Sequence, residues 1–166
     1  MSGVTKEVLV FPASFSQQRL WFLNRLEPGA ATFNMSAAVR LTGPLNAPAL
    51  EQSIGEVVRR HESLRTTLVE VDGEPFQVVS PFLGFTLPTI NIKGEREAEE
   101  LARQEARRPF DLAQGPLLRA TLLRPGADQH ILLLTMHHAI SDGWSVAVFI
   151  REMTTLYRAF AAGEQQ

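Results

Sequence analysis

The sequence predicts an α/β protein, an α+β sandwich in which helices pack on a mixed sheet. Segments rich in branched or continuous apolar residues, typical of strands, alternate with segments whose apolar residues recur at helical spacing. The 166 residues match one ordinary domain, which can bury a sizeable core. Because no internal repeat or low-complexity linker divides the chain, residues 1–166 are expected to form a single domain.

The first part of the chain predicts a helix, a strand and a second helix. Leucines recur at helical spacing in 16–26, and Ser14 or Ser16 can cap this helix. Residues 35–41 alternate loosely and lead into a Gly-Pro turn, which indicates a strand. The next helix, over 46–61, starts at an asparagine cap and carries one apolar stripe.

The middle of the chain predicts a hairpin, a weak strand and a surface helix. Residues 64–79 carry branched residues on both sides of an Asp-Gly pair, so a hairpin with its turn at VDGE is expected. A further weak strand is expected over 85–92. Residues 94–108 are charged with a narrow apolar face, which indicates a surface helix that Pro109 ends.

Two strands and a long helix complete the pattern. Residues 117–123 and 130–136 are expected to be strands joined at RPGADQ, and the continuous apolarity of ILLLTM is typical of a central strand covered on both faces. Residues 144–160 carry apolar side chains on one side of a helix. The polar segment HHAISDG lies between this strand and this helix, where such sheets place their binding crevices.

Composition excludes several classes of partner. With 16 basic and 18 acidic residues, the net charge of -2 gives no strong field, so neither nucleic acid nor a membrane surface is expected to bind. The absence of cysteine excludes disulfides and thiolate sites and fits a reducing compartment. The first eleven residues lack the features of a signal peptide, and the apolar runs are too short to span a bilayer. A cytoplasmic protein is expected.

The stretch MHHAISDGWS, Met136 to Ser145, has three interpretations. Both histidines can be packing residues, because histidine is intermediate in burial. A metal site could use either one with Asp142 and His130, but no known ligand spacing supports it, and none is expected. A neutral imidazole could instead accept a proton. If the strand continues through His138, the side chains of His137 and His138 point to opposite faces, so only one can face a cleft.

Asp142 also leaves alternatives open. It could hold the imidazole or the loop in place, or the following Gly143 could turn its carboxylate back into the protein. A buried carboxylate needs a cation, and Arg60 and Arg65 are candidates. Arg60 could also serve only as a charge at a helix C-terminus.

Three stretches together resemble one family. SFSQQRLWFL (14–23), RHESLRTTL (60–68) and MHHAISDGWS (136–145) resemble, in order and spacing, the first three core motifs of the condensation domains of nonribosomal peptide synthetases. The resemblance covers about residues 11–160. The first and third motifs look most like the subtype that joins an L-configured donor to an L-configured acceptor.

The resemblance implies a chloramphenicol-acetyltransferase-like fold of two lobes with a tunnel between them. Two phosphopantetheine arms, delivered by upstream and downstream peptidyl carrier domains, would enter this tunnel, and no cofactor is expected to bind directly. Only the N-terminal lobe is matched, so residues 1–166 would be the N-terminal subdomain and the C-terminal lobe would be a partner. The chain alone is therefore expected to form the peptide bond negligibly, because one wall of the tunnel would be missing.

The resemblance also implies residue roles. His138 would be catalytic, as the general base or as the group that orients the acceptor amine, and Gly143 would bring a backbone N–H close to the reacting centre. His137 would be structural. Asp142 would pair with an arginine, Arg65 or alternatively Arg60, to hold the loop.

Trp144 and Ser145 would line the substrate tunnel.

Other functions remain as alternatives to peptide-bond formation. The chain could be a non-catalytic fragment that docks carrier proteins, or an acyltransferase that uses coenzyme A, since the wider superfamily shares the H-x-x-x-D-G core found at 138–143. The RLWFL motif disfavours the second alternative, and it also disfavours an epimerisation domain.

Overall fold

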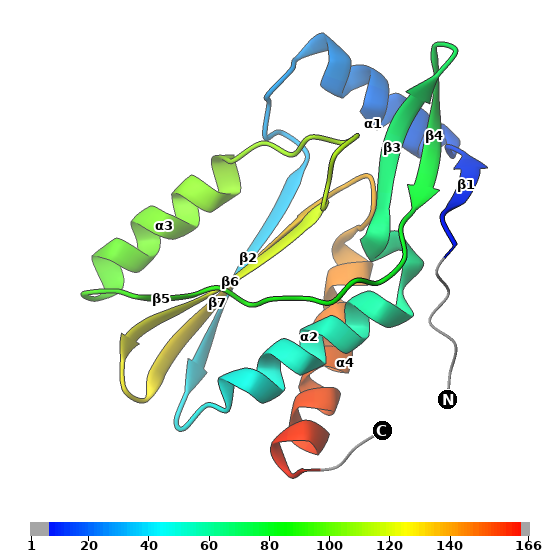
Figure 1. The fold of residues 1–166 in the computed structure, drawn as a ribbon. Helices are drawn as coiled ribbons and strands as arrows, with labels where there is room; N and C mark the ends of the chain where they lie inside the picture. Colours follow the sequence, from blue (N-terminus) through cyan, green and yellow to red (C-terminus); the bar gives the residue numbers. More distant parts are fainter. Residues whose placement is uncertain (1–6, 164–166) are drawn as a thin grey trace.

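The computed structural model describes residues 7–163, so the first six residues of the segment tested for a signal peptide lie outside it. Helices and strands alternate along most of the chain, as Figure 1 shows. The elements in chain order are β1 (Leu9–Pro12), α1 (Phe15–Leu26), β2 (Asn34–Thr42), α2 (Ala47–Arg60), the 3₁₀ turn η1 (Glu62–Arg65), β3 (Thr66–Val71), β4 (Glu74–Val79), β5 (Thr89–Asn91), α3 (Glu95–Arg107), β6 (Leu118–Gly126), β7 (Gln129–His137) and α4 (Gly143–Ala161). None of the helices within 7–163 is long and apolar enough to cross a membrane.

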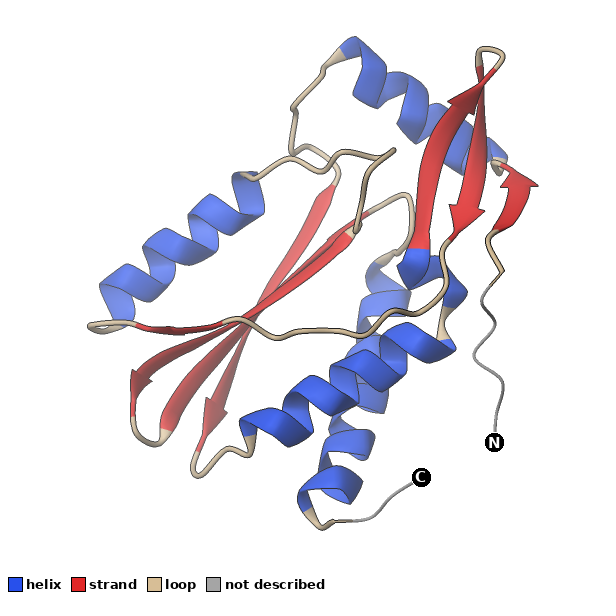
Figure 2. Cartoon of the chain, in the orientation of Figure 1, coloured by secondary structure: helices blue, strands red, loops and turns tan. Residues whose placement is uncertain are grey.

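The larger sheet has the order β2-β7-β6-β5, with β7 inside it. After Gln129, every residue of β7 is buried, which confirms the prediction of a central strand covered on both faces. Leu132, Leu134 and Met136 join the core formed with α2 and α4, whereas Ile131 and Leu133 join a smaller core with α3. Figure 2 shows α3 on one side of the sheet and α2 with α4 on the other. The predicted mixed sheet with packed helices is therefore confirmed.

The smaller sheet has the order β1-β4-β3, and α1 is tied to it. Arg25 of α1 pairs with Glu70 of β3 at 2.6 Å. The hairpin between β3 and β4 turns at the predicted Asp-Gly pair, where both residues have positive φ angles of 52° and 85°. A two-residue hairpin turn requires positive φ angles at these positions, so the Asp-Gly pair was sufficient to predict where the hairpin turns.

Two predicted strand segments are wrong in part. The weak strand expected over 85–92 is reduced to β5, because Pro88 has no N–H to donate and the N–H of Leu87 donates to the Glu51 carboxylate of α2 at 2.7 Å. Residues 64 and 65 lie in η1 rather than in the hairpin, since the Thr66 hydroxyl donates to the Glu62 carbonyl and closes a turn there. The hydrogen bond from Leu87 to Glu51 holds the segment before β5 close to α2.

His137, the last residue of β7, is part of the core. It is 2% exposed, and its ring lies edge-on to Phe33 and Phe110, with centroids 6.2 and 6.0 Å away. Burial, with a smaller contribution from neighbouring His138, lowers the pKa of His137 to about 4. His130, 1% exposed, has a pKa lowered chiefly by burial. The folded state therefore favours the neutral form of both imidazoles.

This burial predicts that stability rises with pH. Between pH 4 and pH 6.5 the unfolded chain binds a proton at His137 that the folded chain does not, so the free energy of unfolding falls as pH decreases through this window. From pH 7.5 to pH 5 the loss from His137 should be about 1–2 kcal/mol. Urea unfolding at several pH values measures it. His137→Gln should be less stable at pH 7.5 and show a shallower slope; equal slopes would contradict the assignment.

Candidate active site

The chain turns immediately after β7. The strand ends at His137, residues 138–140 form a turn, and α4 begins at Gly143. The N–H of His138 donates to the Phe33 carbonyl at 2.9 Å. The turn begins at residue 138, so the strand ends at His137, and the bond to Phe33 extends the pairing of β2 with β7 by one residue. His137 is buried and His138 is exposed.

The ring of His138 is fixed by a backbone carbonyl. Its Nδ1 lies 2.8 Å from the carbonyl oxygen of Ser141. A carbonyl oxygen only accepts hydrogen bonds, so Nδ1 carries the proton and, in the neutral ring, Nε2 keeps its lone pair. The Ser141 hydroxyl donates in turn to the His137 carbonyl at 3.2 Å. The arrangement can present a neutral imidazole as a proton acceptor.

His137 has a different set of contacts. Besides its two phenylalanine neighbours, its Nδ1 accepts a hydrogen bond from the N–H of Ala139 at 3.0 Å. The ring is thus a packing residue that also shapes the turn. Between residues 7 and 163 the structure contains no group of three side chains that could hold a metal ion. His130 lies at the other end of β7, paired with Leu41, so it does not meet the loop.

Asp142 is the N-cap of α4. One of its carboxylate oxygens accepts hydrogen bonds from the N–H of Ser145 at 2.7 Å and from the Ser145 hydroxyl at 2.6 Å. These two bonds lower the pKa of Asp142 below its ordinary value. The carboxylate therefore supports the first turn of the helix, where negative charge is favourable.

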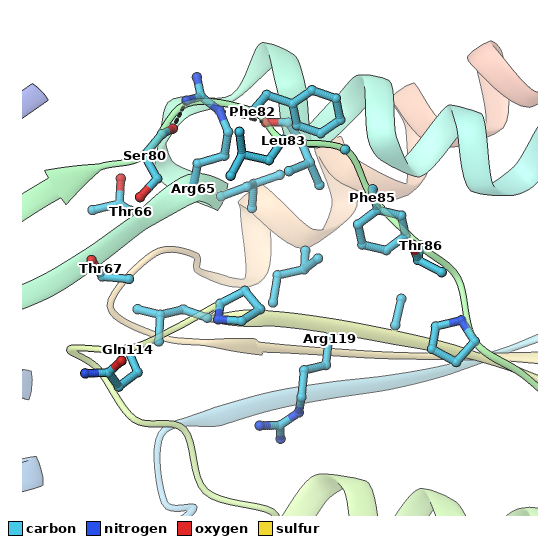
Figure 3. Close-up of a pocket in the computed structure, with 18 of the residues that line it drawn as sticks. Arg65, Thr66, Thr67, Ser80, Phe82, Leu83, Phe85, Thr86, Gln114 and Arg119 are labelled. Atoms are coloured by element: carbon cyan, nitrogen blue, oxygen red, sulfur yellow. Dashed lines mark hydrogen bonds between the residues drawn. The ribbon is translucent and has the colours of Figure 1, made fainter. Parts of the chain in front are cut away.

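The expected pairing of Asp142 with an arginine is not formed in the described part of the chain. Arg65 donates from Nε to the Val58 carbonyl at 3.3 Å and from Nη1 to the Ser80 carbonyl, a bond drawn in Figure 3. Arg60 donates to Glu56 at 2.6 Å. The prediction fails because Asp142 satisfies its carboxylate within its own helix, whereas Arg65 fastens the end of β4 to α2.

The start of α4 borders open space. A Cβ added at Gly143 would meet no other atom within 4 Å, and Trp144 is 78% exposed. Gly143 also lines a hollow of about 330 Å³ whose other walls come from β2, β7 and Val146. The hydroxyl of Ser145, a predicted tunnel residue, instead donates a hydrogen bond to the Asp142 carboxylate. Space for a ligand therefore adjoins Gly143 and Trp144.

A second cavity, of about 580 Å³, lies between β3 and β6 (Figure 3). Its walls include Arg65, Thr67, Phe82, Phe85 and residues 117–121, and the chain between 137 and 145 contributes nothing to them. Of the predicted site residues, Arg65 lines this cavity. The two histidines, Asp142 and the start of α4 instead lie together at the junction of β7 and α4.

Two contacts of the loop were missed by sequence reasoning. The Gln17 side chain donates to the Ala139 carbonyl at 3.2 Å, and Phe33 accepts from His138 through its backbone. The S-x-x-Q spacing of residues 14–17 indicates a capping box, which the structure contains. Nothing in that spacing indicates that the same glutamine reaches a loop 122 residues later in the chain.

Close relatives by sequence are large synthetases. Linear gramicidin synthase of Brevibacillus parabrevis contains a stretch that is 50% identical to this chain over 159 residues, and malpinin synthetase of Mortierella alpina contains one that is 43% identical over 157 residues. Each alignment covers 92% of this chain but only 3% and 2%, respectively, of the relative. The chain therefore corresponds to a small part of these proteins.

Solved structures share the fold. The starter condensation domain of rhizomide synthetase RzmA superposes with a TM-score of 0.87 at 20% identity, covering 95% of this chain and 41% of that one. The first condensation domain of the calcium-dependent antibiotic synthetase gives 0.84 at 22% identity, covering 94% and 40%. A family model described as Condensation domain matches residues 9–166. The resemblance carried by the three motifs is thus confirmed, and the chain belongs to the condensation domain family.

Proposed function

We propose that residues 1–166 are the N-terminal subdomain of a condensation domain that forms a peptide bond in nonribosomal peptide biosynthesis. The donor would be a peptidyl or aminoacyl thioester and the acceptor an aminoacyl thioester, each held on a carrier protein by a phosphopantetheine arm. Family membership supports the reaction class. The observation that carries the proposal is the exposed His138, whose Nδ1 is held by a backbone carbonyl so that Nε2 can accept a proton.

This geometry is compatible with the proposed reaction. The acceptor amine attacks the donor carbonyl carbon, the tetrahedral intermediate collapses, and the C–S bond breaks to release the donor arm as a thiol. A proton leaves the amine, and His138 Nε2 receives it or orients the N–H while it is lost; the sulfur gains a proton. Because Nδ1 donates to the Ser141 carbonyl whether or not Nε2 is protonated, the ring would keep its orientation while Nε2 receives the proton.

The start of α4 would stabilise the developing oxyanion. The N–H of Gly143 belongs to the first turn of the helix, which has no intrahelical acceptors for its first donors. The space in front of Gly143 lets a substrate carbonyl approach. Trp144 and Ser145 would lie along the substrate tunnel, with Ser145 acting through Asp142.

The second wall of that tunnel would come from the C-terminal lobe. This chain covers 41% of a solved condensation domain chain, and it exposes large apolar side chains that such a lobe could cover. Among them are Phe15 (89%), Leu83 (91%) and Trp144 (78%). The chain alone would hold its substrates poorly, so we propose that catalysis requires both lobes.

The first test is a single-turnover assay with donor and acceptor loaded on carrier domains. A condensation domain with both lobes should form product, and His138→Ala should lower the rate about 10²- to 10⁴-fold because proton transfer is lost. His61→Ala, at another partly exposed histidine that bonds to Glu152, is the matched control and should stay near the parent rate. The 166-residue chain should form no product.

Other outcomes would replace the proposal. A His138→Ala domain with the parent rate would show that the imidazole has no catalytic role. Product from the isolated chain would show that one lobe positions both substrates. Binding of loaded carriers without product, even by the two-lobed domain, would favour the docking-fragment alternative, and turnover of acyl-coenzyme A with a free amine would favour the coenzyme A-dependent acyltransferase.

Gly143→Ala tests whether the substrate approaches this residue closely, under conditions in which the fold should be unaffected. The added methyl meets no atom of this chain, and alanine suits a helix, so the melting temperature should not fall. The condensation rate of the two-lobed domain should fall by at least about tenfold, since the methyl occupies the substrate's space. Gly126→Ala, which also meets no atom within 4 Å, is the control. An unchanged rate would exclude close approach at Gly143.

Asp142 substitutions test whether its role is a helix cap or a charge partner. Asp142→Asn keeps an oxygen that accepts from Ser145, so the midpoint of urea unfolding should stay close to that of the parent chain. Asp142→Ala removes the acceptor and should lower the midpoint of urea unfolding. Urea unfolding measures both variants. If asparagine destabilises as much as alanine, the negative charge rather than the cap is what the loop requires.

A further inference from the structure

The backbone of Ala139 forms hydrogen bonds through both its N–H and its carbonyl oxygen. Its N–H donates to His137 Nδ1 at 3.0 Å, and its carbonyl oxygen accepts from Gln17 Nε2 at 3.2 Å. Ala139 directly follows His138 and is 6% exposed. Gln17 therefore links α1 by a hydrogen bond to the turn that contains the exposed His138.

The side-chain amide of Gln17 is fully engaged. Its Oε1 accepts from the N–H of Ser14 at 2.9 Å, while Nε2 donates to Gln77 Oε1 at 3.0 Å and to the Ala139 carbonyl. Reversing the amide would set an NH₂ group against the N–H of Ser14 and an oxygen against the Ala139 carbonyl, so only one orientation satisfies all the contacts. Gln77 is itself fixed, because its own Nε2 donates to the Pro12 carbonyl at 3.2 Å.

We propose that Gln17 is a positioning residue for the condensation reaction and acts through the Ala139 peptide on the orientation of His138; this inference rests on the proposed function. The Ile140 N–H and the Ser141 hydroxyl close the turn by donating to the His137 carbonyl. Two other bonds act on His138 directly: the Phe33 carbonyl accepts from its N–H, and the Ser141 carbonyl accepts from its ring. Both of those bonds require the turn to keep its shape. The Gln17 bond constrains the peptide between them.

The neighbouring glutamine gives a matched control. Gln18 also lies in α1, and its Nε2 also donates to a backbone carbonyl, that of Ala13, at 2.9 Å. Gln17→Glu keeps an oxygen for the Ser14 N–H, since glutamate serves a capping box as well as glutamine does, but removes the N–H that reaches Ala139. Gln18→Glu makes the same change of charge and removes the same kind of donor from a carbonyl outside the turn.

The kinetic test uses the two-lobed condensation domain. Gln17→Glu should lower kcat about tenfold with KM within about twofold, because substrate contacts remain while the imidazole is misplaced. The pH dependence of kcat should keep its shape, whereas an electrostatic effect of the new carboxylate would shift it. Gln18→Glu should keep the parent kcat. Equal kcat values for the two variants at equal melting temperatures would overturn the proposal.

The second test uses the 166-residue chain and requires no activity. The ¹⁵N NMR shifts of the imidazoles report which ring nitrogen carries the proton. In the parent chain and in Gln18→Glu, His138 should show protonation at Nδ1, and Gln17→Glu should shift it towards a mixture of tautomers. Unchanged His138 shifts in a folded Gln17→Glu chain would overturn the proposal. If His138→Ala keeps full condensation activity, the proposed function fails, while this measurement still decides whether Gln17 positions the ring.

Discussion

The burial of β7 on both faces is the constraint on which the rest of the structure depends. The strand lies inside its sheet between β2 and β6, so its backbone donors and acceptors are used on both edges, and helices cover its side chains above and below. A polar side chain of β7 can therefore reach solvent only where the strand leaves the sheet. His137 marks this boundary, because it is still packed within the core while the next residue is exposed.

The loop beyond that boundary is held mainly by neutral groups. A carbonyl orients His138, a buried imidazole accepts from the Ala139 N–H, and a glutamine amide holds the Ala139 carbonyl. The single carboxylate of the loop, Asp142, is committed to the first turn of α4. Hydrogen bonds between neutral partners depend less on ionic strength than exposed ion pairs do. Around such a scaffold, the charge that the proposed proton transfer would create is the main electrostatic change expected at the site.

The elements that could be predicted from the sequence are those specified by local signals. Asn46 caps α2 and the Asp-Gly pair turns the β3–β4 hairpin, each through residues within a few positions. The site was predictable as far as its residues are contiguous in the chain, from His137 to Ser145. The roles of Arg65 and Gln17 were not, because each depends on a contact with a distant segment, a carbonyl at Ser80 or at Ala139. Residue spacing carries no information about which distant backbone group a long polar side chain reaches.

The pairing of β2 with β7 has a consequence for how the chain is made. Asn34 lies opposite His137, and in the described residues β2 has β7 as its one neighbour in the sheet. A ribosome that has released β2 must therefore synthesise the chain as far as residues 129–137 before that strand finds its partner. Contacts between segments so distant in sequence favour slow folding, and an unpaired strand invites association between nascent chains. The early helix α2, with its own cap, can form during this interval, but α4 cannot cover its apolar stripe until residues 143–161 have been synthesised.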